Sequence, residues 1–353
     1  MINVSRNKQS TRVEFIKDEQ PISWLIINHL KIYVWGKEFT CGGIGGVGTK
    51  EEFRKKGYSK AVLDKSLEVM REQDYDFSLL FGIPNYYYRW GFASCFPQNR
   101  VEIATFQAER ATLTHEVEKL LPEHFPRLVE IYNQNNATRT GSVLRDPKEF
   151  TKLRVGSHFG IRASGYVFKR DGQIEGYLIL DELDRRVNAS EIGGINPSVY
   201  YSALAFLATK AIEKRVENVS ANLPLDHPFA LIAREFAATV SANYIYNADG
   251  MGRIINQESV LKAIEEDLFK NSNIDPQKTS LLFKTDLENT QIGSGKKVVE
   301  ISLDQKSLTQ LIFGYRDAAS LNYEGKLSSD LEIETLALMF PHRISHLSGP
   351  DKF

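Results

Sequence analysis

A run of small residues between Cys41 and Thr49 is the feature that most restricts the fold of this chain. The segment CGGIGGVGT packs five glycines into eight residues and follows a stretch rich in β-branched and aromatic residues. Gly36-Lys37 separates two such stretches and predicts a hairpin turn, so the glycines come at the end of an antiparallel strand. Because cationic residues follow closely, this bare backbone suggests a phosphate-binding turn.

The segment from Arg54 to Ser59, with sequence RKKGYS, carries the stronger phosphate signal. Gly57 and Ser59 leave room for backbone N–H groups to approach an anion, and a helix is predicted from about residue 56 to 73. The first turn of a helix offers unpaired N–H groups and the positive end of the helix dipole. For the segment taken alone, a solvated basic helix start is an equally good interpretation.

Two other phosphate motifs were weighed against this one. Residues 43–48 match the dinucleotide fingerprint G-x-G-x-x-G, but that fingerprint requires a buried parallel strand before it and an acidic residue after the next strand. Here the preceding strand is a hairpin arm, and Asp76 lies before the next strand. The nucleoside-triphosphate loop is excluded, because VGTK reverses the required order of Gly, Lys and Ser/Thr.

Hydrophobic periodicity divides the chain into three units. After the helix, the first unit has a short apolar strand at 77–82, an aromatic segment, and a strand at 101–106; residues 107–119 are expected to form a linker. The second unit repeats the order of strand ending in Gly-Gly, helix, short strand and final strand, but INPSVYY replaces the cationic turn after Gly194. A third unit with two strands and several helices starts near residue 258 and shows no such repeat.

Amino-acid composition limits which binding partners and which cellular compartment are expected for this chain. Lys and Arg total 44 against 45 Asp and Glu, a net charge of -1 that argues against nucleic acid as the main partner. Two cysteines, Cys41 and Cys95, do not make a disulfide framework and favour a reducing cytoplasm. No signal peptide or membrane span is expected. His342 and His346 are spaced like metal ligands, but no third ligand lies nearby, so no metal site is predicted.

The order of these motifs resembles the GNAT superfamily of acyl-CoA-dependent acetyltransferases. Arg54–Ser59 resembles that family's pyrophosphate loop, with Ser59 replacing the usual final Gly or Ala. The segment YYYRWGF resembles its late motif, in which a Tyr four residues before a Gly-Phe pair commonly serves as general acid; here that residue is Tyr87. An active unit, a degenerate copy and a C-terminal unit resembling a sterol carrier together resemble the enhanced intracellular survival (Eis) type.

This resemblance implies an α+β and α/β architecture with two tandem GNAT-like mixed-sheet domains, the second degenerate, followed by a sterol-carrier-like α+β domain. The expected ranges are 1–110, 111–256 and 257–353. A full GNAT unit usually opens with a strand and two helices, whereas only about 20 residues precede the first long strand here. Those opening helices normally wall the acceptor site. The resemblance also implies a homo-oligomer.

Site residues follow from the same resemblance. Acetyl-CoA is expected as co-substrate, without a metal. The backbone of Val47, Gly48 and Thr49 is expected to hold the pantetheine arm, and Gly82 and Ile83 to line the other side of the cofactor site. The pyrophosphate is expected to be wrapped by Arg54, Lys55, Lys56, Gly57, Tyr58, Ser59 and Lys60.

Two residues are expected to carry the chemistry. Tyr87 is the candidate acid for the leaving thiolate, with an ordinary phenol pKa of ~10; packing of Tyr86, Tyr87 and Tyr88 around a short helix is the alternative. The carboxylate of Phe353 is the candidate base or amine anchor, because the family's C-terminus turns back into the first domain's active site. A frayed terminus is the alternative.

Two functions follow. The first is an acetyl-CoA-dependent N-acetyltransferase that acts by direct attack of a primary amine, which belongs to a small molecule such as a large cationic one or to a lysine side chain. The second is a non-catalytic acyl-CoA or lipid-binding protein that uses its C-terminal unit. Arg54–Ser59 and the Tyr87 segment favour the first function, since a domain that had lost its catalytic role would not require them.

Overall fold

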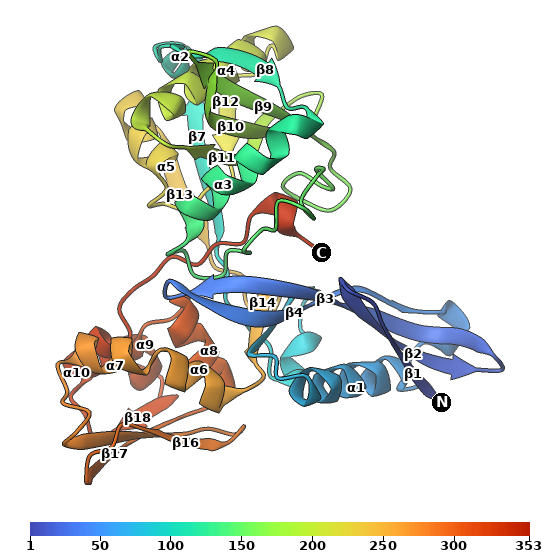
Figure 1. Cartoon of the computed structure of the whole chain (residues 1–353), viewed down its shortest axis with the longest axis vertical. Helices are drawn as coiled ribbons and strands as arrows, with labels where there is room; N and C mark the ends of the chain where they lie inside the picture. The colour runs from blue at the N-terminus through green and yellow to red at the C-terminus, as the bar shows by residue number, and fades with distance from the viewer. The chain divides into compact units, whose positions relative to one another are not determined.

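The computed structural model describes all 353 residues and divides into two compact units (Figure 1). The first unit consists of Met1–Phe96, Ile245–Ser345 and the terminal Phe353. The second consists of Pro97–Tyr244 and His346–Lys352. The chain therefore passes from the first unit to the second and back, and each unit has its own sheet.

The first unit is built on a seven-stranded mixed sheet. Its strands, in spatial order, are β1 (Ile2–Arg6), β2 (Ser10–Lys17), β3 (Gln20–Val34), β4 (Lys37–Thr49), β5 (Phe77–Gly82), β14 (Asp249–Ile254) and β6 (Ala93–Ser94). The hairpin predicted at Gly36-Lys37 is confirmed: β3 and β4 pair antiparallel from Val34–Lys37 to Ser23–Thr49. Gly36 has a positive φ of 75°, which a tight hairpin turn requires.

One face of this sheet is covered by helix α1 (Tyr58–Glu72), as predicted for that segment. Val62, Leu63 and Met70 recur at helical spacing and are fully buried against Leu25, Ile27 and Ile44 of the sheet. The apolar stripe of α1 therefore fixes which face of each strand is the core face.

The chain opens with strands instead of helices. β1 and β2 form an antiparallel hairpin that pairs with β3, and they occupy the segment in which a full GNAT unit would carry its opening helices. No helix precedes β3 in this structure. On the sheet face opposite α1, β3 keeps Trp24, Ile26 and Asn28 partly exposed.

The second unit has a seven-stranded sheet of its own. In spatial order its strands are β13 (Thr239–Asn243), β7 (Gln98–Ala104), β12 (Asn218–Ala221), β11 (Val187–Gly194), β10 (Gln173–Asp181), β9 (Ala163–Arg170) and β8 (Glu116–Lys119). Helix α4 (Pro197–Lys214) packs on one face and α3 (Phe125–Asn136) on the other. The expected repeat is present, because β11 ends in Gly-Gly and pairs parallel with β12 as β4 does with β5.

Two strands belong to sheets other than those expected from their positions in the sequence. The strand expected at 101–106 as part of the first unit is β7, which pairs with β12 and β13 in the second sheet. Conversely β14, within the range expected for the second unit, pairs with β5 in the first sheet. Strand partners are chosen by long-range packing, which local periodicity does not encode. Residues 107–119, expected as a linker, include strand β8.

The remaining helices of the first two ranges are short. They are α2 (Thr105–Ala108) and α5 (Pro228–Ala233), with single 3₁₀ turns η1 (Glu51–Phe53), η2 (Tyr87–Trp90), η3 (Pro122–His124) and η4 (Arg234–Phe236).

Residues 257–345 add a four-stranded sheet and five helices to the first unit, so the third range is α+β as expected (orange to red in Figure 1). The strands, in spatial order, are β16 (Asn289–Ile292), β15 (Thr279–Lys284), β17 (Lys297–Leu303) and β18 (Leu327–Ser329). The helices are α6 (Gln257–Ala263), α7 (Glu265–Ser272), α8 (Gln305–Phe313), α9 (Ala318–Tyr323) and α10 (Ile333–Met339). The likeness to a sterol carrier stays a prediction.

Helix α8 ties this part to the first sheet. The indole N–H of Trp35 donates to the carbonyl oxygen of Ile312 (2.8 Å), and the Gln310 amide donates to the carbonyl oxygen of Ser94 (3.0 Å). The rings of Phe313 and Phe77 pack edge to face with centroids 5.5 Å apart. The sheet face opposite α1 is thus covered by α8 near Phe77, where β5 begins.

The segment His346–Lys352 is fixed within the second unit by a buried arginine. The guanidinium of Arg145 donates two hydrogen bonds to Glu191 (2.8 and 2.6 Å) and two to Asp351 (2.7 and 3.0 Å), and all three side chains are at most 5% exposed. The hydroxyl of Tyr132 also donates to Asp351 (2.7 Å). The 3₁₀ turn η5 (Gly349–Asp351) is therefore a built-in part of this unit.

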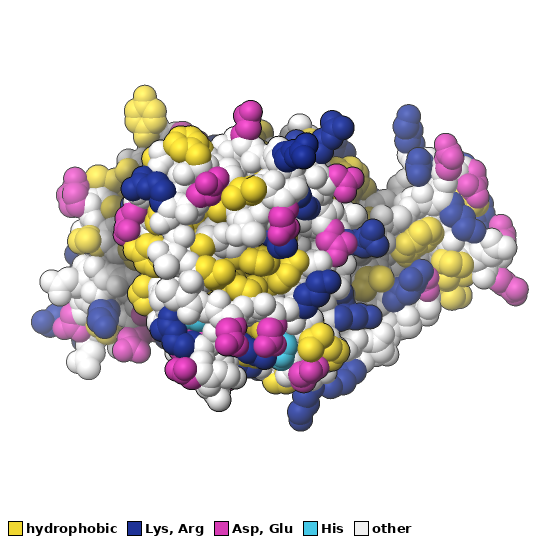
Figure 2. Space-filling view, turned by 90° about the horizontal axis from the view of Figure 1, so that it is seen from above, with side chains coloured by type: hydrophobic (Ala, Val, Ile, Leu, Met, Phe, Trp, Pro, Cys, Tyr) yellow, Lys and Arg dark blue, Asp and Glu magenta, His cyan; other side chains and the backbone are white.

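Charged side chains of both signs intermingle on the face drawn in Figure 2, with apolar side chains gathered near its middle. This distribution accords with the net charge of -1. None of the helices is both long enough and apolar enough to cross a membrane.

We predict that Asp351→Asn destabilises the protein by about 3–5 kcal/mol, because it leaves the buried charge of Arg145 partly uncompensated. The measurement is urea unfolding followed by circular dichroism. Asp184→Asn, at an exposed position of the same unit, is the matched control and should change the free energy of unfolding by no more than about 0.5 kcal/mol. Equal, small effects of the two changes would contradict the structural role of Asp351.

Candidate active site

Each glycine of β4 leaves room for a particular neighbour. A methyl group on Gly42 would lie 2.3 Å from the sulfur of Met70, on the α1 side of the sheet. On the opposite face, a methyl group on Gly43 would lie 2.9 Å from the ring of Phe353, and one on Gly45 would lie 2.9 Å from its terminal carboxyl carbon. Much of the glycine run is therefore explained by close packing of the chain on itself.

β4 and β5 part just where the expected pantetheine segment begins. Their parallel ladder runs only from Cys41–Phe77 to Ile44–Leu80, although β4 continues to Thr49. Gly46 has a φ of +57° and lies in a bulge, so β4 turns away while it stays paired with β3 through Gly48 and Thr49. Backbone groups of residues 45–49 on the β5 side therefore have no ladder partner and can bind an extended ligand.

The start of α1 has the geometry of an anion site. Gly57 is the N-cap residue with a φ of +84°, nothing would lie within 4 Å of a methyl group on it, and no side chain caps the helix. The first N–H groups of a 15-residue helix are thus left to an external acceptor. The hydroxyl groups of Ser59 and Tyr86 lie 2.9 Å apart and join this turn to the segment that follows β5.

The cationic side chains expected around the pyrophosphate are exposed, and three of the four contact residues four or five positions away in the sequence. Lys60 pairs with Asp64 (2.5 Å), Lys56 donates to the carbonyl oxygen of Glu52 (2.8 Å), and Arg54 lies 3.4 Å from the carbonyl oxygen of Thr49. Lys55 has a φ of +60° in the turn before the helix. Exposed side chains of this kind can turn to a phosphate at small cost.

Three further expected residues are placed differently. Tyr58 packs its ring against Phe15 and Phe53, with centroids 4.7 and 6.0 Å apart, so its side chain serves packing and only its backbone belongs to the helix start. Val47 and Ile83 are 36% and 62% exposed, on the two strand ends that part.

Tyr87 lies in the turn η2 at the end of β5. Its ring is 3.0 Å from where a methyl group on Gly82 would stand, and it packs among Met251 and Phe92 on the α1 side of the sheet. Burial, with a smaller contribution from Tyr86, raises the pKa of Tyr87 to about 12. The expectation of an ordinary phenol pKa is thus corrected, because the ring is only 7% exposed and its phenolate would be poorly solvated.

Phe353 lies on the other face of the same strands. Its ring contacts Phe81 of β5, with centroids 5.8 Å apart, and its terminal carboxyl group lies over Gly45. The Asn28 amide, which donates to the carbonyl oxygen of Gly43 (2.9 Å), borders the same spot. The last residue is therefore packed in place and not frayed. A buried phenol and a carboxylate thus flank the point where β4 and β5 part, one on each face.

The alternative motifs find little support in the geometry. Residues 43–48 lie within a strand that continues to Thr49, so they do not form the turn between a strand and a helix that the dinucleotide fingerprint requires. His342 and His346 lie outside any helix, and no group of three metal-ligating side chains is found in the structure.

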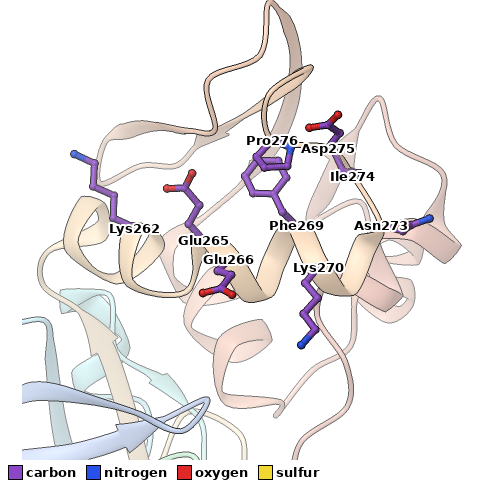
Figure 3. A pocket seen from close by; sticks show the side chains of 9 residues that line it. All are labelled: Lys262, Glu265, Glu266, Phe269, Lys270, Asn273, Ile274, Asp275 and Pro276. Carbon is purple, nitrogen blue, oxygen red and sulfur yellow. The ribbon is translucent and has the colours of Figure 1, made fainter.

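A hollow of about 710 Å³ lies elsewhere, beside α6 and α7 (Figure 3). It is lined by Lys262, Glu265, Glu266, Phe269, Lys270, Asn273, Ile274, Asp275 and Pro276. Five of these nine residues are charged, and Phe269 is only 3% exposed. Apolar surface from Phe269, Ile274 and Pro276 therefore lies beside these charged side chains in the lining.

Comparison with known proteins agrees with this geometry. Residues 6–95 match the family model described as an acetyltransferase (GNAT) domain. No curated protein gives a significant match.

Solved structures match over nearly the whole chain. A probable N-acyltransferase from Enterococcus faecalis is 17% identical over 98% of this chain and 89% of its own, with a TM-score of 0.73. A GCN5-related N-acetyltransferase from Anabaena variabilis is 19% identical over 97% and 89%, with a TM-score of 0.74. Eis1 from Mycobacterium abscessus is 14% identical over 97% and 90%, with a TM-score of 0.70.

The chain therefore contains, at residues 6–95, a segment that matches a GNAT acetyltransferase domain. Its fold over nearly the whole length is shared with Eis1, so the expected likeness to the Eis type is confirmed for the fold.

The sequence reasoning missed several residues that shape the site. Trp24, whose ring would lie 2.6 Å from a methyl group on Gly48, and Asn28 come from β3, which was treated only as a strand. The alternation along β3 carries the signal: Leu25 and Ile27 face α1, so Trp24, Ile26 and Asn28 must face the other side. What lies on that side, namely Phe353, was not predictable from spacing.

We predict that Gly45→Ala displaces Phe353, because the new methyl group would meet its carboxyl carbon at 2.9 Å while the backbone of residue 45 has no positive φ to strain. The rate at which carboxypeptidase A releases Phe353 should rise about tenfold, corresponding to a loss of about 1.4 kcal/mol of docking free energy. Asp184→Asn, at the exposed position already used as a control, is the control here as well. Release rates that are the same in both variants and in the wild type would show that Phe353 does not occupy this position.

Proposed function

We propose that the protein is an acetyl-CoA-dependent N-acetyltransferase that transfers an acetyl group to a primary amine by direct attack. The observation that carries this proposal is the early end of the β4–β5 ladder at Ile44–Leu80, with Tyr87 on one face and the carboxylate of Phe353 on the other. The match of residues 6–95 to an acetyltransferase domain supports the same reaction class.

The residues present fit acetyl-CoA, which would supply the acetyl thioester. The uncapped start of α1, with Gly57 open to solvent, would hold the pyrophosphate together with Lys55 and its cationic neighbours. Backbone groups of Val47, Gly48 and Thr49 would bind the pantetheine amides as an additional strand would. An N–H group of this segment would also stabilise negative charge on the carbonyl oxygen as the amine attacks.

Phe353 would receive the amine on the face opposite α1. Its carboxylate attracts the ammonium and accepts its proton, directly or through water, so that nitrogen can attack as the neutral amine. An α-carboxyl of pKa ~3.3–3.7 is a weak base for an amine near ~10, so orientation of the amine is the larger part of its role.

Tyr87 would protonate the sulfur as the carbon–sulfur bond breaks. Because burial raises its pKa to about 12, the phenol stays protonated throughout the neutral range; it is also a weaker acid than an ordinary phenol, so it would give up its proton only as negative charge develops on the sulfur. Its proton returns from solvent after the products leave. The net change is one amide bond formed, one thioester bond broken and one proton released from the ammonium.

A thiol-release assay with acetyl-CoA and a panel of primary amines tests the proposal, together with calorimetry of acetyl-CoA binding. Turnover with at least one amine and micromolar binding are expected. Absence of binding heat, or equally good competition by a mononucleotide, would refute an acetyl-CoA site.

For Tyr87→Phe we predict a loss of kcat on the order of 10²-fold with acetyl-CoA affinity nearly unchanged, because the ring stays and only the proton donor goes. Between pH 7 and 10 the wild type should show no decline attributable to Tyr87, since its folded-state pKa lies above that window. Activity should instead rise with pH as the amine loses its proton. Unchanged kcat in the variant would remove Tyr87 from the mechanism.

For deletion of Phe353 we predict a loss of kcat/KM for the amine of about 10²-fold, with acetyl-CoA binding retained. Gly45→Ala should lower kcat/KM in the full-length chain but add little in the shortened chain, because both changes remove the same contact. Additive losses would mean that Gly45 acts independently of Phe353.

A further inference from the structure

The acceptor side of the proposed site is a partly exposed sheet face with few charges. On the strands β2 to β5 it carries Trp24, Ile26 and Leu30 of β3 and Phe81 of β5, together with the ring of Phe353. α1 covers the opposite face, and the opening helices that would wall the site in a full GNAT unit are replaced by β1 and β2. Substrate selection on this face therefore falls to strand residues.

Trp24 is the aromatic residue that β3 places on this face, beside the backbone expected to hold the pantetheine. It pairs directly with Gly48, and atoms of its indole ring lie 2.6 to 2.9 Å from where a methyl group on Gly48 would stand. Gly48 thus admits the flat ring against the backbone that would hold the pantetheine. Ser23 fixes the same backbone, because its hydroxyl donates to the carbonyl oxygen of Gly48 (3.2 Å).

The charges around Trp24 are already balanced apart from that of Phe353. Glu14 of β2 stands opposite Trp24 in the register and is the only acidic side chain that β2 to β5 place on this face. It pairs with Arg12 (2.6 Å), whose guanidinium also lies 6.0 Å from the centre of the Trp24 ring. Once the Arg12–Glu14 pair of these strands is set aside, the terminal carboxylate is the negative charge that lies over β4 on this face.

We propose that the acceptor is a primary amine with a single positive charge on an apolar, ring-bearing skeleton, and that Trp24 is the residue that selects it. The ammonium lies at the Phe353 carboxylate, and the carbon skeleton packs on the indole ring and on Ile26. A polycationic amine would meet Arg12 and only one unpaired carboxylate, which disfavours it. This inference rests on the proposed acetyl transfer and concerns which amine is taken.

The test compares 2-phenylethylamine with spermidine as acceptors, in the full-length protein and in Trp24→Ala and Trp24→Phe. In the wild type, kcat/KM should be at least about tenfold higher for 2-phenylethylamine. Trp24→Ala should lower it about tenfold or more for this amine, mainly through KM, and should lower it less for spermidine, so that the preference between the two amines shrinks; Trp24→Phe should restore most of the loss. Tyr323→Ala, at a side chain that is 93% exposed, is the control for removal of an aromatic ring.

Binding measurements distinguish failure of the proposed amine selectivity from failure of the proposed acetyl transfer. Calorimetry of both amines with the CoA-saturated protein should give the same preference and the same effect of Trp24→Ala without any turnover. Preference for spermidine, or an equal loss for both amines in Trp24→Ala, would overturn the selectivity while leaving acetyl transfer intact. Failure of the wild type to bind acetyl-CoA would overturn the proposed function, and the selectivity with it.

Discussion

The structure of the first unit depends on β4 having almost no side chains where it passes between two packed faces. Gly42 admits Met70 of α1 on one face, while Gly43 and Gly45 admit Phe353 on the other. With a side chain at Gly45, the terminal carboxyl group would be pushed away from the end of the β4–β5 ladder. The glycine run that suggests a phosphate-binding turn in the sequence therefore serves mainly to make room for neighbouring side chains. The proposed phosphate site is the start of α1, about ten residues later.

The two sheets share one plan, and their differences explain why only the first is proposed to hold a cofactor. β11 also continues beyond its last pair with β12, which is Ala189–Ala221. There, however, the chain satisfies its own backbone: Asn135 bonds both the N–H and the carbonyl oxygen of Gly194, and His227 bonds the carbonyl oxygen of Ile192. Helix α4 also starts with Pro197, which has no N–H, and no Lys or Arg lies in its first turn. The backbone groups at the end of such a strand are available to a ligand only where no neighbouring side chain bonds to them.

Much of the local structure was predictable because it follows from the spacing of apolar residues within single helices and strands. The hairpin at Gly36-Lys37, α1 and β5 lie within a few residues of their expected positions. The pairing of β7 in the second sheet and of β14 in the first was not predictable, since the alternation of apolar and polar residues in both segments suits either sheet. The partner strand is decided by contacts between residues more than 100 positions apart in the sequence. Tyr87 was found by its spacing from Gly91, but its raised pKa comes from burial among residues as distant as Met251, which spacing does not reveal.

The positions of Tyr87 and Phe353 also bear on the order of proton movements. The phenol is nearly buried and holds its proton to about pH 12, whereas the carboxyl group belongs to a chain end that must stay ionised to attract an ammonium. If the two lay on the same face, a cationic amine would sit beside the phenol and lower its pKa, and the two groups would titrate together. With the parted ends of β4 and β5 between them, each would keep the protonation state that its proposed role requires. In the proposed mechanism the sheet would thus separate the group that receives a positive charge from the group that gives up a proton.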